Sequence, residues 1–523
     1  MKKSVRGMSL VLIASVMIAL LAACASSNNS GDSTSTSPAN GAAPSDSTTK
    51  DNAPAAEKPA EKPELKVLLP YAAADYNTSV PAQILEEKTG YKVRYDMLPQ
   101  DRPMDKLNIV MASGEAYDAV SIGSVDKQLY YDYAQRGALT DLTPLIEQYG
   151  PNIKAAISQA SLDAVKVDGK IYSIPTKGSS YASWSVTLRQ DWLEKLNLQM
   201  PTTLDELVAV LKAFKEQDPG GNGDRNIPLV AMGDVPLENI RGAFGMAHEW
   251  SVIDGKLVNM AEHPALKEYI GFVSGLLKEG LLDKEFVTTK EATMLEKFSS
   301  GQAGAMIGAW FQLPTISEAI VKNNPGAKIT FTGALAGKDG KAGLAMGDGF
   351  ELFTFVPKSS EHPEEAIKWI NERLDPETFK NSYIGLEGTH HTLQDGDYNP
   401  INPKFSDEFG FANNMRMGVD EKIVTDYWQA RVKKNELNYQ GWKTINSIPE
   451  EHKARDPLAF APVLPELAKN SAQLKTLLND YITKTTVKDD FDATYEAFLK
   501  SWKEAGGEVV TKEVNDWYST VNP

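Results

Sequence analysis

Patterns that would support covalent catalysis are absent from this sequence of 523 residues. It contains no Gly-x-Ser-x-Gly elbow, no His-Glu-x-x-His helix, no Gly-x-x-x-x-Gly-Lys-Ser/Thr loop and no Cys-x-x-Cys pair. His248-Glu249 lacks the second histidine of a zinc helix, and the adjacent His390 and His391 would point apart on a strand or helix. Two carboxylates could still serve a glycosidase, because their separation is not readable from a sequence. A hydrolase therefore remains an alternative.

A glycine-rich loop over residues 218–228 offers oxygen ligands for calcium. An EF-hand loop supplies hard oxygens at alternating positions, with glycine at the sixth. This loop has Gly223 at position 6, but Gly220 at position 3, and Leu229 where a bidentate glutamate would stand. A glycine-rich turn after a helix is the alternative, and both interpretations stay open. The residues that would supply oxygens are Asp218, Asn222, Asp224 and Asn226.

Aromatic and polar residues that could hold a sugar recur near the ends of expected strands. The C–H face of a sugar ring packs on the face of an aromatic ring, and Trp184 and Trp310 both border strands. The alternative for each is an ordinary place in the core. Glu387, in a Gly-Leu-Glu-Gly loop, fits a ligand contact, a solvated side chain or an ion pair. The candidate ligand-binding residues are Tyr71, Asp75, Asn77, Ser124, Tyr181, Trp184, Trp310, Tyr383, Glu387 and Trp428.

Strands and helices alternate in the first part of the folded region. This order predicts a parallel or mixed sheet covered by helices. Ligands of such sheets bind outside the carboxyl ends of the strands, which places residues 71–77 and Gly123-Ser124 at a ligand site. The strands are expected at residues 65–70, 92–97 and 119–122, with helices at 82–89 and 104–112.

Residues 167–214 predict a passage from one lobe to another. An Asp-Gly turn at Asp168 precedes a short β-rich run, and small residues fill 177–184. A helix then starts at Thr203, where Glu206 has the spacing of a capping box. We expect the cleft between two lobes to lie beside the segment of small residues.

The N-terminus is typical of an exported lipoprotein. Three cations among the first six residues precede an apolar run over 8–21 that is too short to span a bilayer comfortably. The run ends at Leu21-Ala22-Ala23-Cys24, which resembles a bacterial lipobox, and Cys24 is the only cysteine. We expect Cys24 to be lipidated on sulfur and to anchor the protein; an ordinary signal peptide with an incidental cysteine is the alternative.

Composition limits the partners of the exported chain. Residues 25–63 contain no aromatic residue and no Leu, Ile, Val or Met, so they should form a disordered tether. Loss of residues 1–23, with three cations and no acid, takes the formal charge from −16 to −19. An acidic surface argues against nucleic acid as a partner. The remaining length predicts two domains.

The order of motifs resembles family 1 extracellular solute-binding proteins of ABC importers. It is closest to their large lipoprotein subgroup, several of whose members bind oligosaccharides. The resemblance covers residue 65 to the C-terminus, and Trp310 is similar to the strand-end tryptophan that stacks on sugar in maltose-type receptors. The motifs lie at 167–214, 116–120 (AYDAV), 298–306 (FSSGQAGAM) and 385–391 (GLEGTHH).

The resemblance implies an α/β, two-lobed periplasmic-binding-protein-like fold with a hinge and an inter-lobe cleft. It implies a monomeric receptor on the extracytoplasmic face of the cell membrane. The receptor would capture a small solute, a carbohydrate, by hinge closure and deliver it to the membrane subunits of an ABC permease. No cofactor would be required, although calcium binding is left open. A receptor for a peptide or another solute is an alternative.

The expected organisation follows from these assignments. A lipoprotein signal peptide covers 1–23, and the lipidated cysteine with its disordered tether covers 24–63. Lobe one is expected at 64–176 plus 333–380, and lobe two at 184–330 plus 384–470. The C-terminal helices at 471–523 are left unassigned between the lobes. Within them, Phe491, Tyr495, Phe498, Leu499 and Trp502 share one helical face, which we expect to be core.

Overall fold

The computed structural model describes residues 62–123, 127–233 and 237–522. The signal peptide, Cys24, nearly all of the tether and Ser124 lie outside the described residues. Within the described ranges, every helix is too short or too polar to cross a bilayer.

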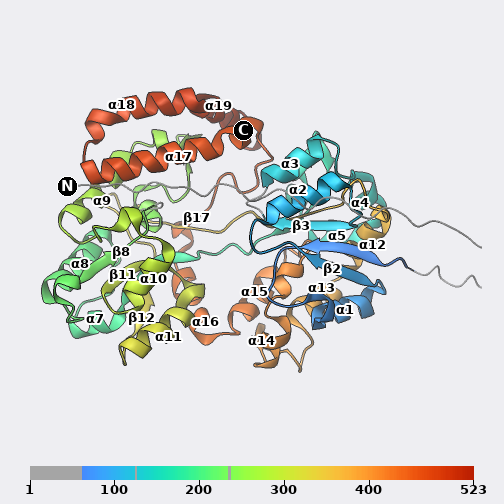
Figure 1. Ribbon diagram of the computed structural model, residues 1–523, viewed down its shortest axis with the longest axis horizontal. Helices are drawn as coiled ribbons and strands as arrows, with labels where there is room; N and C mark the ends of the chain where they lie inside the picture. Colours follow the sequence, from blue (N-terminus) through green and yellow to red (C-terminus); the bar gives the residue numbers. More distant parts are fainter. Residues whose placement is uncertain (1–61, 124–126, 234–236, 523) are drawn as a thin grey trace, which may run out of the picture. The chain divides into compact units, whose positions relative to one another are not determined.

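Lobe one is built on a five-stranded mixed sheet (Figure 1). The three predicted strands are confirmed: β1 pairs in parallel with both β2 and β3. Two later segments extend the sheet: β14 pairs antiparallel with β3, and β6 pairs antiparallel with β14. Across the sheet the order is β2 (Val93–Met97), β1 (Leu65–Leu69), β3 (Ala119–Gly123), β14 (Phe350–Phe355) and β6 (Ile174–Lys177).

Helices cover this sheet and bury a continuous apolar core. Gly90 ends the first helix in the left-handed conformation with φ 66°, which glycine adopts at no steric cost. The core also takes in side chains from Phe405 to Ala430. The helices are α1 (Val80–Thr89), α2 (Pro103–Ser113), α3 (Lys127–Gln135), α4 (Thr143–Tyr149), α5 (Pro151–Ala156), α6 (Gln159–Asp163), α12 (Pro363–Arg373), α13 (Pro376–Ile384), α14 (Lys404–Phe409) and α15 (Val424–Val432).

Lobe two has its own sheet and its own core. Thr203 caps α8, and the reciprocal hydrogen bonds between Thr203 and Glu206 confirm the predicted capping box. The sheet order is β12 (Ile329–Phe331), β7 (Trp184–Arg189), β11 (Ala303–Ala309) and β8 (Ile227–Val230). The helices around it are α7 (Gln190–Lys195), α8 (Leu204–Gln217), α9 (Leu266–Lys278), α10 (Glu291–Ser299) and α11 (Leu313–Asn323), and a hairpin is formed by β9 (Trp250–Ile253) and β10 (Lys256–Asn259).

The C-terminal helices pack on lobe two. Figure 1 shows them together along one side of that lobe, and their buried residues belong to its core. Trp502 is fully buried, and the four other residues of the predicted apolar face are partly buried against the same core. These helices are α17 (Pro465–Lys488), α18 (Phe491–Trp502) and α19 (Glu508–Val521).

Three chain segments run side by side between the two sheets, and we call them the crossover ribbon. The first, residues 178–183, joins β6 to β7. The second, residues 344–349, leads into β14, and it pairs with the first through an Ala182–Met346 bridge. The third segment contains the short strand β17 (Lys453–Ala454). It pairs in parallel with β13 (Leu344–Ala345) of the second segment. Backbone hydrogen bonds therefore join all three segments.

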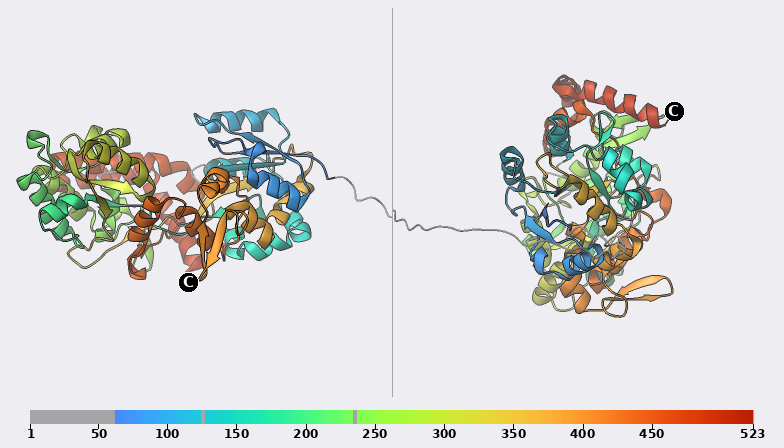
Figure 2. Two further views of the ribbon diagram at one scale, coloured as in Figure 1. Left: turned by 90° about the horizontal axis from the view of Figure 1, so that it is seen from below. Right: turned by 90° about the vertical axis from the view of Figure 1, so that its right-hand side faces the viewer.

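The division between the lobes differs from the expected one over residues 384–470. Side chains from Phe405 to Ala430 pack in the core of lobe one, although we expected this stretch in lobe two. The chain leaves lobe one only after α15, and α16 (Glu436–Asn446) then contacts α11 and β12 of lobe two. In the right-hand view of Figure 2, the hairpin of β15 (His391–Gln394) and β16 (Asp397–Pro400) projects from its neighbours.

Candidate functional site

Three of the predicted aromatic residues meet on one face of the crossover ribbon. Tyr181 stacks on Trp428 with ring centroids 5.3 Å apart and planes inclined by 9°. The edge of Trp310 meets Tyr181 at 6.0 Å. We call this side of the ribbon the aromatic face. It also contains Ala182, Leu313, Phe331, Leu344, Met346, Val432 and Ile445.

Helix α16 closes the aromatic face. Gly441 allows the close approach, because a Cβ at this position would lie 2.5 Å from Leu313 and 3.2 Å from the Cβ of Trp310. Asn446 donates to the carbonyl of Ala182 at 3.0 Å and accepts from its N–H at 2.7 Å. Trp310 is consequently only 6% exposed. Its indole N–H is buried without a hydrogen-bond partner in the described part of the chain, as is that of Trp428, and its role as a ligand contact stays a prediction.

Trp184 lies at the edge of this group. It contacts Phe311 edge to face at 5.8 Å, and Phe311 in turn contacts Trp310 at 5.5 Å. Strand β11 ends at Ala309, so Trp310 and Phe311 lie in the helical turn that follows it. Phe311 is 48% exposed. Of this pair of neighbours in sequence, Phe311 offers the accessible ring.

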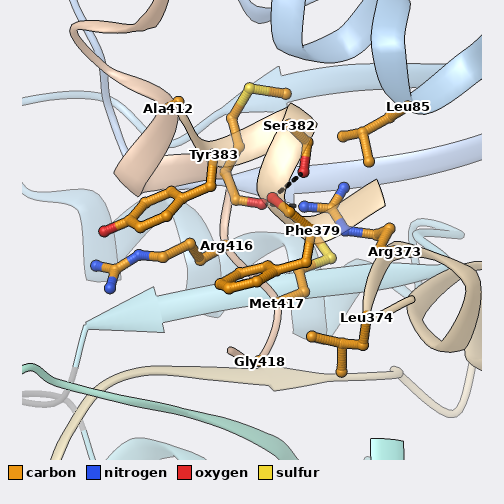
Figure 3. A pocket seen from close by; sticks show the side chains of 11 residues that line it. Leu85, Arg373, Leu374, Phe379, Ser382, Tyr383, Ala412, Arg416, Met417 and Gly418 are labelled. Atoms are coloured by element: carbon orange, nitrogen blue, oxygen red, sulfur yellow. Dashed lines mark hydrogen bonds between the residues drawn. The ribbon is translucent and has the colours of Figure 1, made fainter. Parts of the chain in front are cut away.

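Tyr383 is part of the core of lobe one, not of an open surface. Its ring stacks on Phe379 at 5.6 Å, and the guanidinium groups of Arg431 and Arg416 lie 4.9 and 5.7 Å from its centroid. Figure 3 shows the Arg416 side chain alongside the Tyr383 ring. Arg416 also donates to the carboxylate of Glu351. Burial raises the pKa of the Tyr383 hydroxyl, so it stays protonated.

The remaining polar candidates have structural partners or lie in the open. The Asp75 carboxylate accepts from the N–H of Asn77 at 3.0 Å, which lowers the pKa of Asp75. The side chain of Asn77 pairs with the backbone of Tyr95 at 2.8 and 2.9 Å. Tyr71 and Glu387 are exposed. These four residues do not come together with the aromatic face in any contact among the described residues.

The glycine-rich loop is organised around Asp218. Its two carboxylate oxygens accept from the N–H groups of Asn222 at 3.0 Å and Gly223 at 2.7 Å. The amide groups of Asn222 and Asn226 donate to the carbonyls of Gly301 and Phe214. Oδ1 of Asn226 is buried without a hydrogen bond, and Asp224 is exposed. Within the described ranges, no group of three acidic, histidine or cysteine side chains is placed to hold a metal.

Sequence reasoning missed a cavity of about 620 Å³ that borders the ribbon on the side away from the aromatic face. Ala345 lines it, whereas its neighbours Leu344 and Met346 pack in the aromatic face, as expected because side chains alternate along a strand. We call it the α17 cavity. It is lined by Arg241, Ala247, His248, Glu249, Trp250, Met260, Ala345, Asp456, Leu458, Leu467, Ser471, Lys475, Leu478 and Asn479.

Ionisable groups of both signs face the α17 cavity. Burial raises the pKa of Glu249, against the opposing effects of Asn259, Lys475 and Arg241. Asn259 donates to one oxygen of Glu249 at 3.3 Å. One sequence signal could have pointed here: along α17, polar Ser471 and Lys475 alternate with buried leucines on its inner side.

Charged side chains also cross-link the ribbon. The guanidinium of Arg455 donates to Ser180 Oγ at 2.7 Å and to Asp348 at 3.2 Å, and these belong to the first and second segments. From lobe one, Lys127 donates to the carbonyl of Ala461 at 2.6 Å. Burial lowers the pKa of Lys127 to about 8. Lobe one therefore contacts the chain just beyond the third segment.

Comparison with known proteins gives one family. The family model for "bacterial extracellular solute-binding protein" matches residues 62–378, more than half of the chain. Lipoprotein LipO of Bacillus subtilis is 28% identical over 473 residues, covering 87% of this chain and 91% of LipO. The polygalacturonan/rhamnogalacturonan-binding protein YtcQ of the same organism is 24% identical over 478 residues, covering 87% of this chain and 92% of YtcQ.

The fructooligosaccharide ABC transporter substrate-binding protein FusA of Streptococcus pneumoniae is similar in both sequence and structure. It is 32% identical over 253 residues, which cover 43% of this chain and 46% of FusA. FusA in complex with kestose superposes with a TM-score of 0.65 at 20% identity, covering 88% of this chain and 99% of FusA. An EF-hand mutant of FusA superposes equally well. The structural likeness confirms the predicted fold class.

Proposed function

Because the chain belongs to the bacterial extracellular solute-binding proteins, we propose that it is the receptor of an ABC importer for a carbohydrate. The observation that carries the proposal is the near full-length similarity to YtcQ, whose name states that it binds polygalacturonan and rhamnogalacturonan. FusA, which superposes over 88% of this chain, is by name the substrate-binding protein of a fructooligosaccharide ABC transporter.

The receptor works by binding and release, with no covalent step. A solute that contacts both lobes stabilises the closed form. The three paired segments of the crossover ribbon bend as the angle between the lobes changes. Release to the membrane subunits of the permease follows reopening. A micromolar complex needs about −8 kcal/mol, which a few ring contacts and a hydroxyl network provide.

Anchoring through Cys24 keeps the receptor at the extracytoplasmic face of the membrane. LipO is a lipoprotein by name, and the sequence ahead of Cys24 has the small residues of a lipobox. Two or more acyl chains hold a protein on a bilayer, since each buried CH₂ contributes about 0.8 kcal/mol. Metabolic labelling with a fatty acid should mark the wild-type chain and not Cys24→Ser.

Calcium binding at the glycine-rich loop is part of the proposal. The loop offers the carboxylates of Asp218 and Asp224, and the buried Oδ1 of Asn226 has no hydrogen-bond partner in the described part of the chain. FusA has been solved as an EF-hand mutant. A rise in melting temperature on adding calcium, reversed by chelator and lost in Asp218→Ala, is the expected result; an unchanged melting temperature favours the simple turn.

A sugar panel tests the proposed function directly. Calorimetry of the mature protein should show saturable binding of an oligosaccharide, and chromatography should recover that sugar intact. Cleavage of the bound sugar would indicate a hydrolase instead. Binding confined to peptides would overturn the carbohydrate assignment.

A further inference from the structure

Four buried polar atoms near the crossover ribbon have no hydrogen-bond partner among the described residues. They are Nε1 of Trp310, Nε1 of Trp428, the hydroxyl of Tyr383 and Nη1 of Arg416. Leaving a buried polar group without a hydrogen bond is costly, so each such group calls for an explanation. All four can donate a hydrogen bond, and we call them the unpaired donors.

The unpaired donors belong to side chains that lie around one ring of the ribbon, that of Tyr181. Trp428 stacks on this ring at 5.3 Å, and the edge of Trp310 meets it at 6.0 Å. Burial raises the pKa of the Tyr181 hydroxyl, and the charges of Tyr383 and Arg416 also act on it, so these two groups lie near it as well. Figure 3 shows the hydroxyl of Tyr383 and the guanidinium of Arg416 pointing to the same side.

This region draws its side chains from both lobes. Trp310 follows β11 of lobe two, whereas Tyr383 lies in α13 and Trp428 in α15, which pack in lobe one. Tyr181 and Trp428 are only half-buried, so the region is open to solvent at their rings. A solute bound here would contact both lobes, as hinge closure requires.

Positive charge is in excess on the lobe one side of this region. The guanidinium groups of Arg416 and Arg431 lie 5.7 and 4.9 Å from the centroid of the Tyr383 ring. Arg416 pairs with Glu351, but the described partners of Arg431 are all uncharged oxygen atoms. Lys434 donates to one of the same carbonyls at 3.3 Å. Three cations therefore face one carboxylate, although the formal charge of the whole chain is −16.

The chemistry of these groups favours a ligand group that accepts hydrogen bonds and is negative. Indole and guanidinium N–H groups can only donate, and a carboxylate only accepts, at about four sites on its two oxygens. Hydrogen bonds between a guanidinium and a carboxylate are shorter and stronger than those between neutral groups. The ribbon has a carboxylate of its own in Asp348, but this pairs with Arg455. The solute is therefore the source of the missing acceptor.

We propose that the region around Tyr181 recognises the carboxylate of an acidic sugar, a uronic acid unit of an oligosaccharide. Arg416 and the indole N–H groups of Trp310 and Trp428 donate to the carboxylate oxygens, and Tyr383 donates through its hydroxyl. The inference rests on the proposed carbohydrate function. It adds the chemical class of the solute and the side chains that recognise it.

The test measures the affinity of the mature protein for matched acidic and neutral trisaccharides by calorimetry. Trigalacturonate is compared with galactotriose, and trimannuronate with mannotriose, so that each pair differs at the carboxylate. Tyr383→Phe removes one hydroxyl and keeps the ring, and Trp428→Phe removes one N–H and keeps a ring against Tyr181. Tyr481→Phe is the matched control, because it removes another buried hydroxyl without a described partner, from α17 in lobe two.

The wild type should bind one acidic trisaccharide about tenfold more tightly than its neutral partner, or better. Tyr383→Phe and Trp428→Phe should each weaken that binding by about tenfold, as expected for the loss of one hydrogen bond to a charged group. Circular dichroism should show both variants folded, and Tyr481→Phe should bind as the wild type does.

Three results would overturn the inference. Equal or tighter binding of the neutral partners would overturn the acidic class and leave the proposed function standing. Acidic trisaccharides bound equally well by the wild type and by both variants would overturn the site around Tyr181. A wild-type protein that binds none of these sugars would overturn the inference and the carbohydrate function together.

Discussion

The two sides of the crossover ribbon use their residues in opposite ways. On the aromatic face, the rings of Tyr181, Trp310 and Trp428 pack against one another beneath α16. On the other side, charged groups such as Glu249 and Lys475 border an open space of about 620 Å³. The difference teaches that one ribbon can bury the side chains on one of its faces and leave those on the other face beside a cavity.

Removing a large ring from the aromatic face should have the largest effect. Trp310→Ala leaves a hole in a closed cluster, so the free energy of unfolding should fall by about 3–5 kcal/mol. From the sequence alone, the same change would be expected to weaken solute binding and spare the fold. Urea unfolding measures the loss.

Phe311→Ala is the matched control for Trp310→Ala, because Phe311 is adjacent but 48% exposed. It should cost about 1 kcal/mol or less, since an exposed ring loses little burial. Equal losses in the two variants would break the contrast between framework and surface.

The chain next to the α17 cavity should respond to acid through His263, three residues after the lining residue Met260. His263 is buried, its Nδ1 accepts from the N–H of Ala265 at 3.1 Å, and burial, with Lys341, lowers its pKa to about 4. Between pH 6.5 and 4 the unfolded chain binds a proton that the folded chain excludes, so stability falls as the pH falls. We expect His263 to account for about 2 kcal/mol of the loss between pH 7 and pH 4.

His263→Asn isolates this contribution, because the Asn side-chain oxygen can accept the same hydrogen bond without titrating. Urea unfolding at pH 7 and at pH 4 should show a smaller acid loss in the variant than in the wild type. Parallel losses would show that His263 plays no part.

Cutting the charged cross-link of the ribbon should have a smaller effect. Arg455→Ala removes the bonds to Ser180 and Asp348 and the ion pair with Glu450, yet Arg455 is 54% exposed, so about 1 kcal/mol is expected. Lys453→Ala, which breaks only an ion pair with Glu450, is the control. A melting temperature lowered no further by Arg455→Ala than by Lys453→Ala would remove the cross-link from the account of the ribbon.

Changing the cavity itself should scarcely affect stability. Lys475→Met removes an exposed charge with no ion pair among the described residues, so the free energy of unfolding should change by about 0.5 kcal/mol at most. A large loss of stability would mean that Lys475 belongs to the framework, and would erase the distinction between the two sides.

Local signals predicted much of the fold. The capping box at Thr203 and the alternation of the first three strands depend on neighbouring residues, and the structure confirms both. The place of Phe405 to Ala430 was not predictable, because an amphipathic helix shows that it has a partner but not which lobe supplies it.

The candidate site was predicted less well for a related reason. Tyr181, Trp310 and Trp428 were singled out and do come together, but burial under α16 depends on Gly441, a contact that no local pattern announces. The α17 cavity joins Arg241, Ala345 and Lys475, which stand more than a hundred residues apart in pairs. Only the folded chain brings them to one place.

The backbone pairing within the ribbon has a mechanical consequence. Because hydrogen bonds join the three segments edge to edge, they should bend as one unit. Cleavage of any single segment should therefore leave the two lobes connected and still able to move. A protein cleaved or circularly permuted inside one segment should therefore keep its fold. A substitution that separates the first segment from the second should instead loosen the connection between the lobes.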